Sequence, residues 1–166
     1  MKRTITVALL TEDTYAPAFI DGLIRRAINE GIITRNVVVC KSRNTYRKIQ
    51  PCTDKMRRIV NTIIDMCDKI LIFQDADGRD RKKVLEEVRS HLGELVKYIN
   101  RRVFIIIFAQ EIEEWIIPNT PSPADYLKRS EGYEKNLLPH YVNRVNFSRV
   151  RDLESFMDFL NALNDD

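Results

Sequence analysis

The sequence predicts an α/β protein with a central, mostly parallel sheet of about four strands flanked by helices. Short runs of apolar and β-branched residues alternate along the chain with stretches whose apolar residues recur at helical spacing. The strand-like runs are also apolar throughout, as expected for strands that helices cover on both faces. With 166 residues and no internal repeat, the chain is long enough for one domain and too short for two ordinary ones.

The first third of the chain predicts a strand, a helix and a second strand. Residues 4–10 (TITVALL) are β-branched and apolar, residues 16–30 carry apolar side chains at helical spacing, and residues 36–40 (NVVVC) form the next apolar run. A basic connection over residues 41–48 then leads to Thr53, whose hydroxyl suits the N-cap of another amphipathic helix.

The middle of the chain predicts two more strands with a helix between them. Residues 69–74 (KILIFQ) and 103–109 (VFIIIFA) are the apolar runs, and residues 79–99 carry one apolar stripe that predicts a single amphipathic helix. Gly93 lies within this stripe, where we expect it to interrupt the helix only mildly.

The last part of the chain is expected to be a helical extension of the same domain. Pro118, Pro121 and Pro123 break the pattern after the fourth strand, which places the core at about residues 1–117 and the extension at about 118–166. Within the extension, helices are expected around residues 125–128, 133–138 and 153–163.

The composition excludes several classes of protein. The formal net charge is only +3, from 27 basic and 24 acidic residues, so charge alone does not indicate a nucleic-acid partner. Cys40, Cys52 and Cys67 are too widely spaced for a C-x-x-C clamp, and no secretory apolar region follows the first residues, which indicates a reduced, cytoplasmic setting. No apolar run approaches the roughly 20 residues of a membrane span. The motifs of serine hydrolases, P-loop NTPases and Rossmann dehydrogenases are lacking.

Three of the predicted strands end in acidic residues. Glu12 follows the first strand, Asp75 and Asp77 follow the third, and Glu111 and Glu113 follow the fourth. The carboxyl ends of parallel strands meet at one edge of the sheet, so these side chains are expected to converge. Like charges ~4 Å apart repel by roughly 4 kcal/mol at a moderate effective dielectric constant, and a cation removes that cost. Oxygen ligands without His or Cys indicate Mg²⁺, Mn²⁺ or Ca²⁺ rather than zinc, and Mg²⁺ suits a site that leaves positions open to water and phosphate.

Each acid also has a structural interpretation. Asp75, Asp77 or Asp80 can cap the helix that follows, and Glu113 and Glu114 are favourable in the first turn of a short helix without any function. At this level both interpretations stay open for every acid taken alone.

The basic and histidine residues yield fewer candidates. Arg79 and Lys82 directly follow the aspartate pair, which makes them candidates for contacts to phosphates bound beside the metal. His91 and His140 have no partner at metal-ligand spacing, and we interpret both as structural.

Two stretches resemble the TOPRIM domain of topoisomerases, bacterial primases and OLD-family nucleases. They are VALLTE, a strand ending in Glu12, and ILIFQDAD, a later strand ending in Asp75 and Asp77. The resemblance implies a Rossmann-like fold, a general acid/base role for Glu12 and Mg²⁺ held by the two aspartates. Residues 111–127 also resemble part of small stand-alone TOPRIM-like proteins that often accompany ATPases in defence-type gene clusters. The chain departs from the family at Asp13, where glycine is usual.

The leading hypothesis is a Mg²⁺- or Mn²⁺-dependent nuclease that cleaves phosphodiester bonds in DNA or RNA. Its catalytic residues would be Glu12, Asp75 and Asp77, its metal ligands these three with Glu111 and Glu113, and its phosphate-binding residues Arg79 and Lys82.

The alternative is a non-catalytic TOPRIM-like module that binds metal or nucleic acid and partners an ATPase in a defence or regulatory system. It predicts an exposed apolar patch around residues 115–117. A receiver-like signalling domain would also gather acids at strand ends, but it needs a lysine after a late strand. The sequence leaves a homodimer open.

Overall fold

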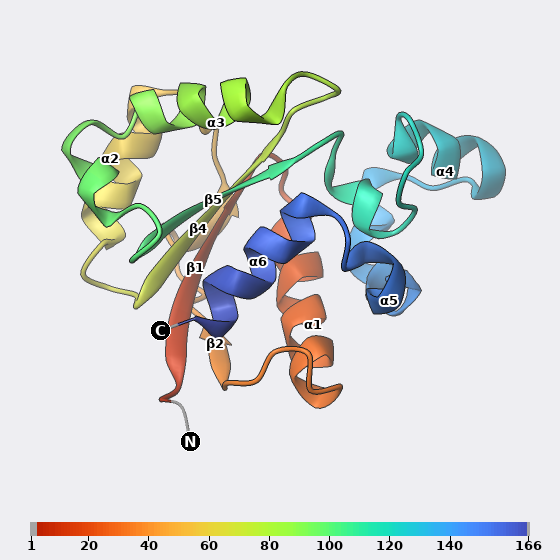
Figure 1. Ribbon diagram of the computed structural model, residues 1–166, viewed down its shortest axis with the longest axis horizontal. Coiled ribbons are helices and arrows are strands. Elements are labelled where there is room, and N and C mark those ends of the chain that lie inside the picture. Colours follow the sequence, from red (N-terminus) through yellow and green to blue (C-terminus); the bar gives the residue numbers. More distant parts are fainter. Residues whose placement is uncertain (1–2, 166) are drawn as a thin grey trace.

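The computed structural model describes residues 3–165 and contains one sheet of parallel strands (Figure 1). The strands are β1 (Ile5–Thr11), β2 (Val37–Val39), β3 (Tyr46–Lys48), β4 (Lys69–Asp75) and β5 (Val103–Phe108). Their order is β2-β1-β4-β5. On the side of β1 away from β4, β2 pairs with the first residues of β1 and β3 pairs with the last residues of β1. The α/β class with a parallel sheet is confirmed, and the short β3 adds a fifth strand within the basic connection.

Helices cover both faces of the sheet. The α-helices are α1 (Ala16–Asn29), α2 (Asp54–Ile63), α3 (Arg81–Ser90), α4 (Pro123–Glu131), α5 (Phe147–Val150) and α6 (Glu154–Asn164). The 3-10 helices are η1 (Gly93–Tyr98), η2 (Ile112–Trp115) and η3 (Lys135–Arg144). Helices α1 and α6 lie on one face, and α2 and α3 lie on the other (Figure 1).

Alternate residues of the central strands enter two separate cores. Leu9 and Leu71 pack with α1 and α6, whereas Leu10 and Ile72 pack with α2 and α3. All four side chains are fully buried. Burying one such side chain stabilises the fold by roughly 1.5–3 kcal/mol, so the uninterrupted apolar runs of the sequence serve both cores at once.

The single helix predicted over residues 79–99 is wrong. Helix α3 ends at Ser90, and the chain turns at Gly93, whose φ of +58° lies in the left-handed region that favours glycine. The chain then continues as η1. Leu92 and Leu95 are both buried in the same core as α3, so the apolar stripe marks burial on one side rather than a continuous helix.

The C-terminal helix completes the core beside β5. Phe156 and Phe159 of α6 pack around Trp115, with ring centroids 5.2 and 5.0 Å from the indole. All three side chains are fully buried, and Ile116 is only 8% exposed. The exposed patch that the non-catalytic alternative predicts at residues 115–117 is therefore wrong, because α6 covers the tryptophan.

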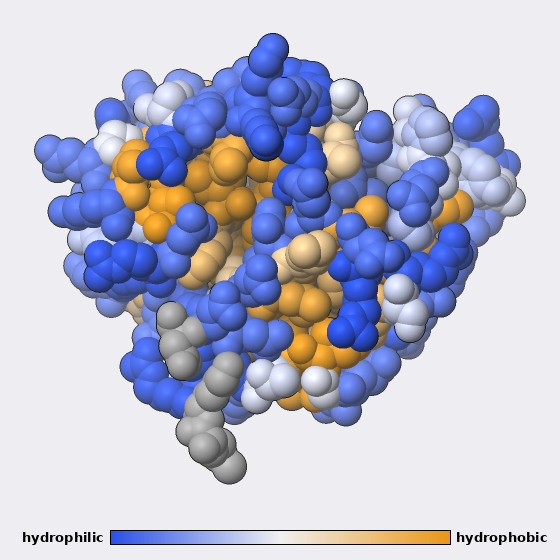
Figure 2. Space-filling view, in the orientation of Figure 1, coloured by the Kyte–Doolittle hydropathy of each residue, from blue (hydrophilic) through white to orange (hydrophobic). Residues whose placement is uncertain are grey.

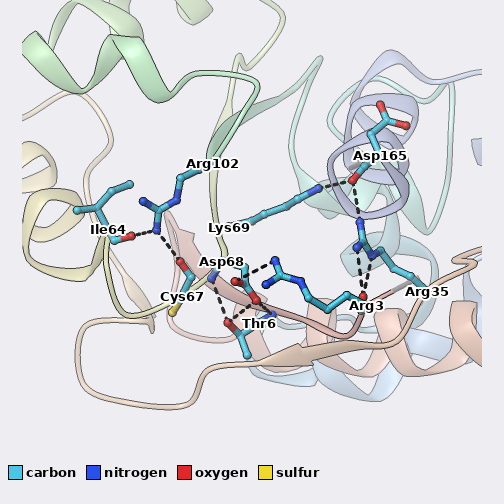
Figure 3. A network of polar contacts seen from close by, with 9 residues as sticks. All are labelled: Arg3, Thr6, Arg35, Ile64, Cys67, Asp68, Lys69, Arg102 and Asp165. Carbon is cyan, nitrogen blue, oxygen red and sulfur yellow. Dashed lines mark hydrogen bonds and ion pairs between the residues drawn. The ribbon is translucent and has the colours of Figure 1, made fainter. Parts of the chain in front are cut away.

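Polar contacts close the amino-terminal edge of the sheet (Figure 3). The Asp68 carboxylate accepts hydrogen bonds from the backbone N–H and hydroxyl of Thr6, and these bonds hold its pKa below the usual range. The Lys69 ammonium and the Arg35 guanidinium both donate to the carbonyl of Asp165, at the negative end of α6. The charged groups at this edge therefore have structural partners.

The surface in Figure 2 is mostly hydrophilic, with one hydrophobic area beneath α3 and another where α6 meets α1. Within residues 3–165, no helix combines the length and the apolar character that crossing a membrane requires.

Candidate functional site

The first two candidate residues meet at the carboxyl-terminal edge of the sheet. Strands β1 and β4 are hydrogen-bonded neighbours, with Leu10 opposite Ile72, so both chains leave the sheet side by side. The backbone N–H of Asp75 donates a hydrogen bond of 2.6 Å to Oε1 of Glu12. The strand order therefore joins the two acids that the sequence separates by 63 positions.

Asp77 lies on a tight turn that leaves the pleat of β4. Its φ is +51°, and that of Gly78 is +83°. The N–H groups of residues 76–78 donate to carbonyls of residues 108–110, which hold the turn against the end of β5. Residues two apart in a strand point to the same face. Although this turn takes Asp77 out of the strand, its carboxylate stays close enough to Asp75 to raise the pKa of that carboxyl.

Neither Asp75 nor Asp77 caps the helix that follows. The N-cap of α3 is Asp80, whose Oδ1 accepts a 2.9 Å hydrogen bond from the N–H of Lys82. The capping interpretation is thus right for Asp80 and wrong for the other two aspartates. Asp13 has a comparable structural contact, because its Oδ1 accepts from the N–H of Ala16 at the start of α1.

Burial and mutual repulsion disturb the ionisation of the central pair. The pKa of Asp75 is raised to about 9, first by burial and then by the carboxylate of Glu12. Asp77 and Glu113 add smaller rises, and Lys135 opposes them. The pKa of Glu12 is raised as well, first by burial and then by Asp77, although the hydrogen bond from Asp75 counteracts it. In these surroundings the ionised, unpaired form of a carboxyl group is unfavourable, so the group tends to bind a proton or another cation.

Glu113 is fully buried beside this pair and is bonded on one oxygen only. Its Oε2 accepts hydrogen bonds from the hydroxyl of Tyr133 at 2.7 Å and from the Lys135 ammonium at 2.6 Å. Its Oε1 is buried and has no hydrogen-bond partner among residues 3–165. A buried carboxylate oxygen without a partner is costly, so this atom is available to a ligand.

Lys135 is the residue of this site that the sequence did not identify. Its Nζ also lies 3.5 Å from Oδ2 of Asp13. Burial alone lowers the pKa of Lys135, but the carboxylates of Glu113 and Asp13 raise it to a net value above normal. It comes from η3 rather than from the end of a late strand. In the sequence it belongs to the stretch Tyr133-Glu134-Lys135, which also resembles the small TOPRIM-like proteins but assigns the lysine no role.

The remaining glutamates of the η2 segment differ in role. Glu111 Oε1 accepts a 3.0 Å hydrogen bond from the N–H of Ala124, and burial raises its pKa. Glu114 accepts hydrogen bonds from the backbone N–H of Gln110 and from the hydroxyl of Ser155, so it ties η2 to α6. Glu114 is therefore structural, whereas Glu111 lies nearer to the pair but already has a partner.

The two predicted phosphate-binding residues, Arg79 and Lys82, differ in whether the protein already pairs their charge. The guanidinium of Arg79 is paired with Glu87. Lys82 is exposed in the first turn of α3. Arg81, between them, turns away to pair with Glu154 of α6.

The carboxylates at this edge of the sheet meet only part of what a hard divalent cation requires. Within residues 3–165, no three side chains of the Asp, Glu, His and Cys types are grouped closely enough to hold a metal by themselves. Mg²⁺ commonly takes only one or two carboxylates and leaves the other positions to water and substrate phosphate. Asp75 and Asp77 with Glu12, and the buried unpartnered oxygen of Glu113, match that demand in chemistry but do not form a closed cage.

No protein-family model matches this chain, and neither a curated protein nor a solved structure matches it.

Proposed function

We propose that this chain catalyses Mg²⁺- or Mn²⁺-dependent cleavage of phosphodiester bonds in DNA or RNA through a TOPRIM-like site. The observation that carries the proposal is the direct contact between Glu12 and Asp75 across the ends of two neighbouring strands. That hydrogen bond holds the Glu12 carboxylate at the end of β4, where its charge raises the pKa of the buried Asp75 carboxyl. A cation bound between the two acids would relieve this repulsion.

The proposed role of each acid follows from the hydrogen bonds that its side chain already forms within the protein. Asp75 and Asp77 would hold the cation, because neither caps a helix. Glu12 would serve as a further ligand or as the general base, and Glu113 would add its unpartnered Oε1. Glu111 is the weakest ligand of the predicted set, since binding a metal through Oε1 would displace its bond to Ala124.

A divalent cation bound here would neutralise the charge of a phosphodiester and lower the pKa of a bound water. The raised pKa of Glu12 brings this carboxyl closer to neutral pH, where a general base accepts a proton most effectively. Lys82, exposed in the first turn of α3, would contact the phosphate.

Lys135 favours the second candidate, a module that binds without cleaving. Its ammonium lies among Glu113, Asp13 and Asp75 and compensates part of their charge without any metal. A site that is internally neutralised needs a metal less, so binding of nucleic acid or of an ATPase partner without turnover is the outcome that this contact supports.

The test is a calorimetric titration of the full chain with Mg²⁺ and with Mn²⁺. Asp75→Asn and Asp77→Asn are expected to lose cation binding while keeping the fold. Asp65→Asn is the matched control, because Asp65 is an exposed acid near the amino-terminal edge of the sheet. The same samples are then incubated with single-stranded and duplex DNA and RNA to detect cleavage.

Binding that depends on both aspartates, together with cation-dependent cleavage, supports the enzyme. Binding without cleavage supports the non-catalytic module. If no cation binds, or if the aspartate variants bind as well as wild type, the acids of this edge are not a metal site and the proposal fails.

A further inference from the structure

A groove lined by basic side chains lies between the segment around β3 and the outer face of α2. One part, about 430 Å³ in volume, is lined chiefly by Arg43, Arg47, Lys55 and Arg58. An adjoining part of about 280 Å³ includes Lys48 and shares Arg47 and Lys55 with the first. We call the surface formed by these five basic residues the basic groove.

The charges of the basic groove are not compensated by the protein. None of its five basic side chains forms an ion pair with another residue of the described range 3–165, and all except the half-buried Arg47 are exposed. Basic residues elsewhere, such as Arg81 and Arg144, are paired with carboxylates. The exposed Asp54 at the start of α2 lines neither part of the groove. A surface of this kind attracts a polyanion.

The basic groove begins next to the candidate metal site. Strand β3 pairs with the end of β1, which places Lys48 opposite Thr11, the residue before Glu12. The N–H of Ile49 also donates a 2.7 Å hydrogen bond to the carbonyl of Thr11. A chain of phosphates lying in the groove would therefore reach the end of β1, where Glu12 follows.

We infer that the basic groove binds the phosphate backbone of a nucleic-acid duplex and leads it to this site. The inference rests on the proposed function and specifies the form of its substrate. It depends on residues of β3 and α2 that take no part in holding the cation.

The lining favours backbone contacts over base contacts. No aromatic side chain lines either part of the groove, whereas proteins that hold single strands stack the bases on aromatic rings. Lys55, Arg58 and Thr62 lie on one face of α2 at spacings of three and four residues. At 1.5 Å per residue this face covers about 10 Å, or about three phosphates of one strand of a duplex.

The test measures binding separately from cleavage. Anisotropy of a short fluorescent DNA duplex is followed in EDTA at several ionic strengths, with RNA duplex and single strands of the same sequence as further probes. The variant is Arg47→Glu/Lys55→Glu. The control is Arg101→Glu/Arg129→Glu, which makes the same change in charge at exposed positions outside the groove.

The groove variant is expected to lose duplex affinity by at least about tenfold and to reduce the slope of log K against log salt by about two, while the control binds like wild type. Equal losses in both variants, or no loss in either, would overturn the inference, as would preferential binding of single strands. If the groove variant instead loses binding to anionic lipid vesicles and keeps duplex binding, the surface is a membrane contact and the inference also fails.

The two proposals fail in different ways. Groove-dependent duplex binding without any cation binding at Asp75 and Asp77 refutes the proposed function and leaves the groove assignment intact. Cation-dependent cleavage that the groove variant carries out with unchanged affinity for duplex refutes the groove assignment alone.

Discussion

Replacing Asp75 with asparagine is expected to stabilise the protein at neutral pH when no divalent cation is present. Burial and the neighbouring Glu12 raise the pKa of this carboxyl from 3.8 to about 9 in the folded chain. The folded state therefore keeps a proton at pH 7 that the unfolded state has released. Stability that is fully present below pH 4 is lost as the pH rises toward 9. Asparagine imitates the protonated carboxyl and does not titrate.

The magnitude follows from the interval over which only the unfolded state is ionised. From 3.8 to pH 7 this interval is about 3 pH units, and each unit corresponds to 1.36 kcal/mol. Asp75→Asn is thus expected to raise the free energy of unfolding at pH 7 by up to about 4 kcal/mol. The gain over wild type should vanish near pH 4 and grow by about 1.4 kcal/mol per pH unit up to pH 8.

Urea unfolding in EDTA across this pH range measures the effect. Asp77→Asn is the matched control: asparagine tolerates the positive φ of this exposed position, so its stability should stay within about 0.5 kcal/mol of wild type. Saturating Mg²⁺ should stabilise wild type, by about 2.7 kcal/mol at a hundredfold excess over Kd, and should leave Asp75→Asn unchanged. A variant that is less stable at pH 7, or whose difference from wild type does not depend on pH, would refute the reasoning.

Two further substitutions separate structural from functional charges. Lys135→Met should lower the free energy of unfolding by on the order of 2 kcal/mol, because the buried Glu113 carboxylate loses its charged partner. Adding Glu113→Gln to the same chain should recover most of that loss, as measured by urea unfolding. Asp80→Ala should lower the free energy of unfolding by about 1 kcal/mol, because it removes the N-cap of α3. The calorimetric titration with Mg²⁺ should be unchanged. Loss of cation binding would instead show that Asp80 belongs to the site together with Asp75 and Asp77.

Periodicity predicted most of the elements because it reports burial. The strands at residues 69–74 and 103–109 and the final helix over 153–163 are confirmed within a residue or two. The same reasoning failed at Gly93, where two successive elements bury one side against the same core. An apolar stripe cannot distinguish that arrangement from one long helix, because both bury the same side chains.

The sequence by itself determined that acids follow three strands and that the chemistry of their oxygens suits Mg²⁺. It did not determine that Glu12 contacts Asp75, because that contact depends on β1 and β4 being neighbours in the sheet. Only the tertiary structure decided that Asp80 is the helix cap and that Lys135 lies among the carboxylates. These facts depend on contacts between segments far apart in the chain, and a local pattern of residues carries no information about which distant segment packs against it.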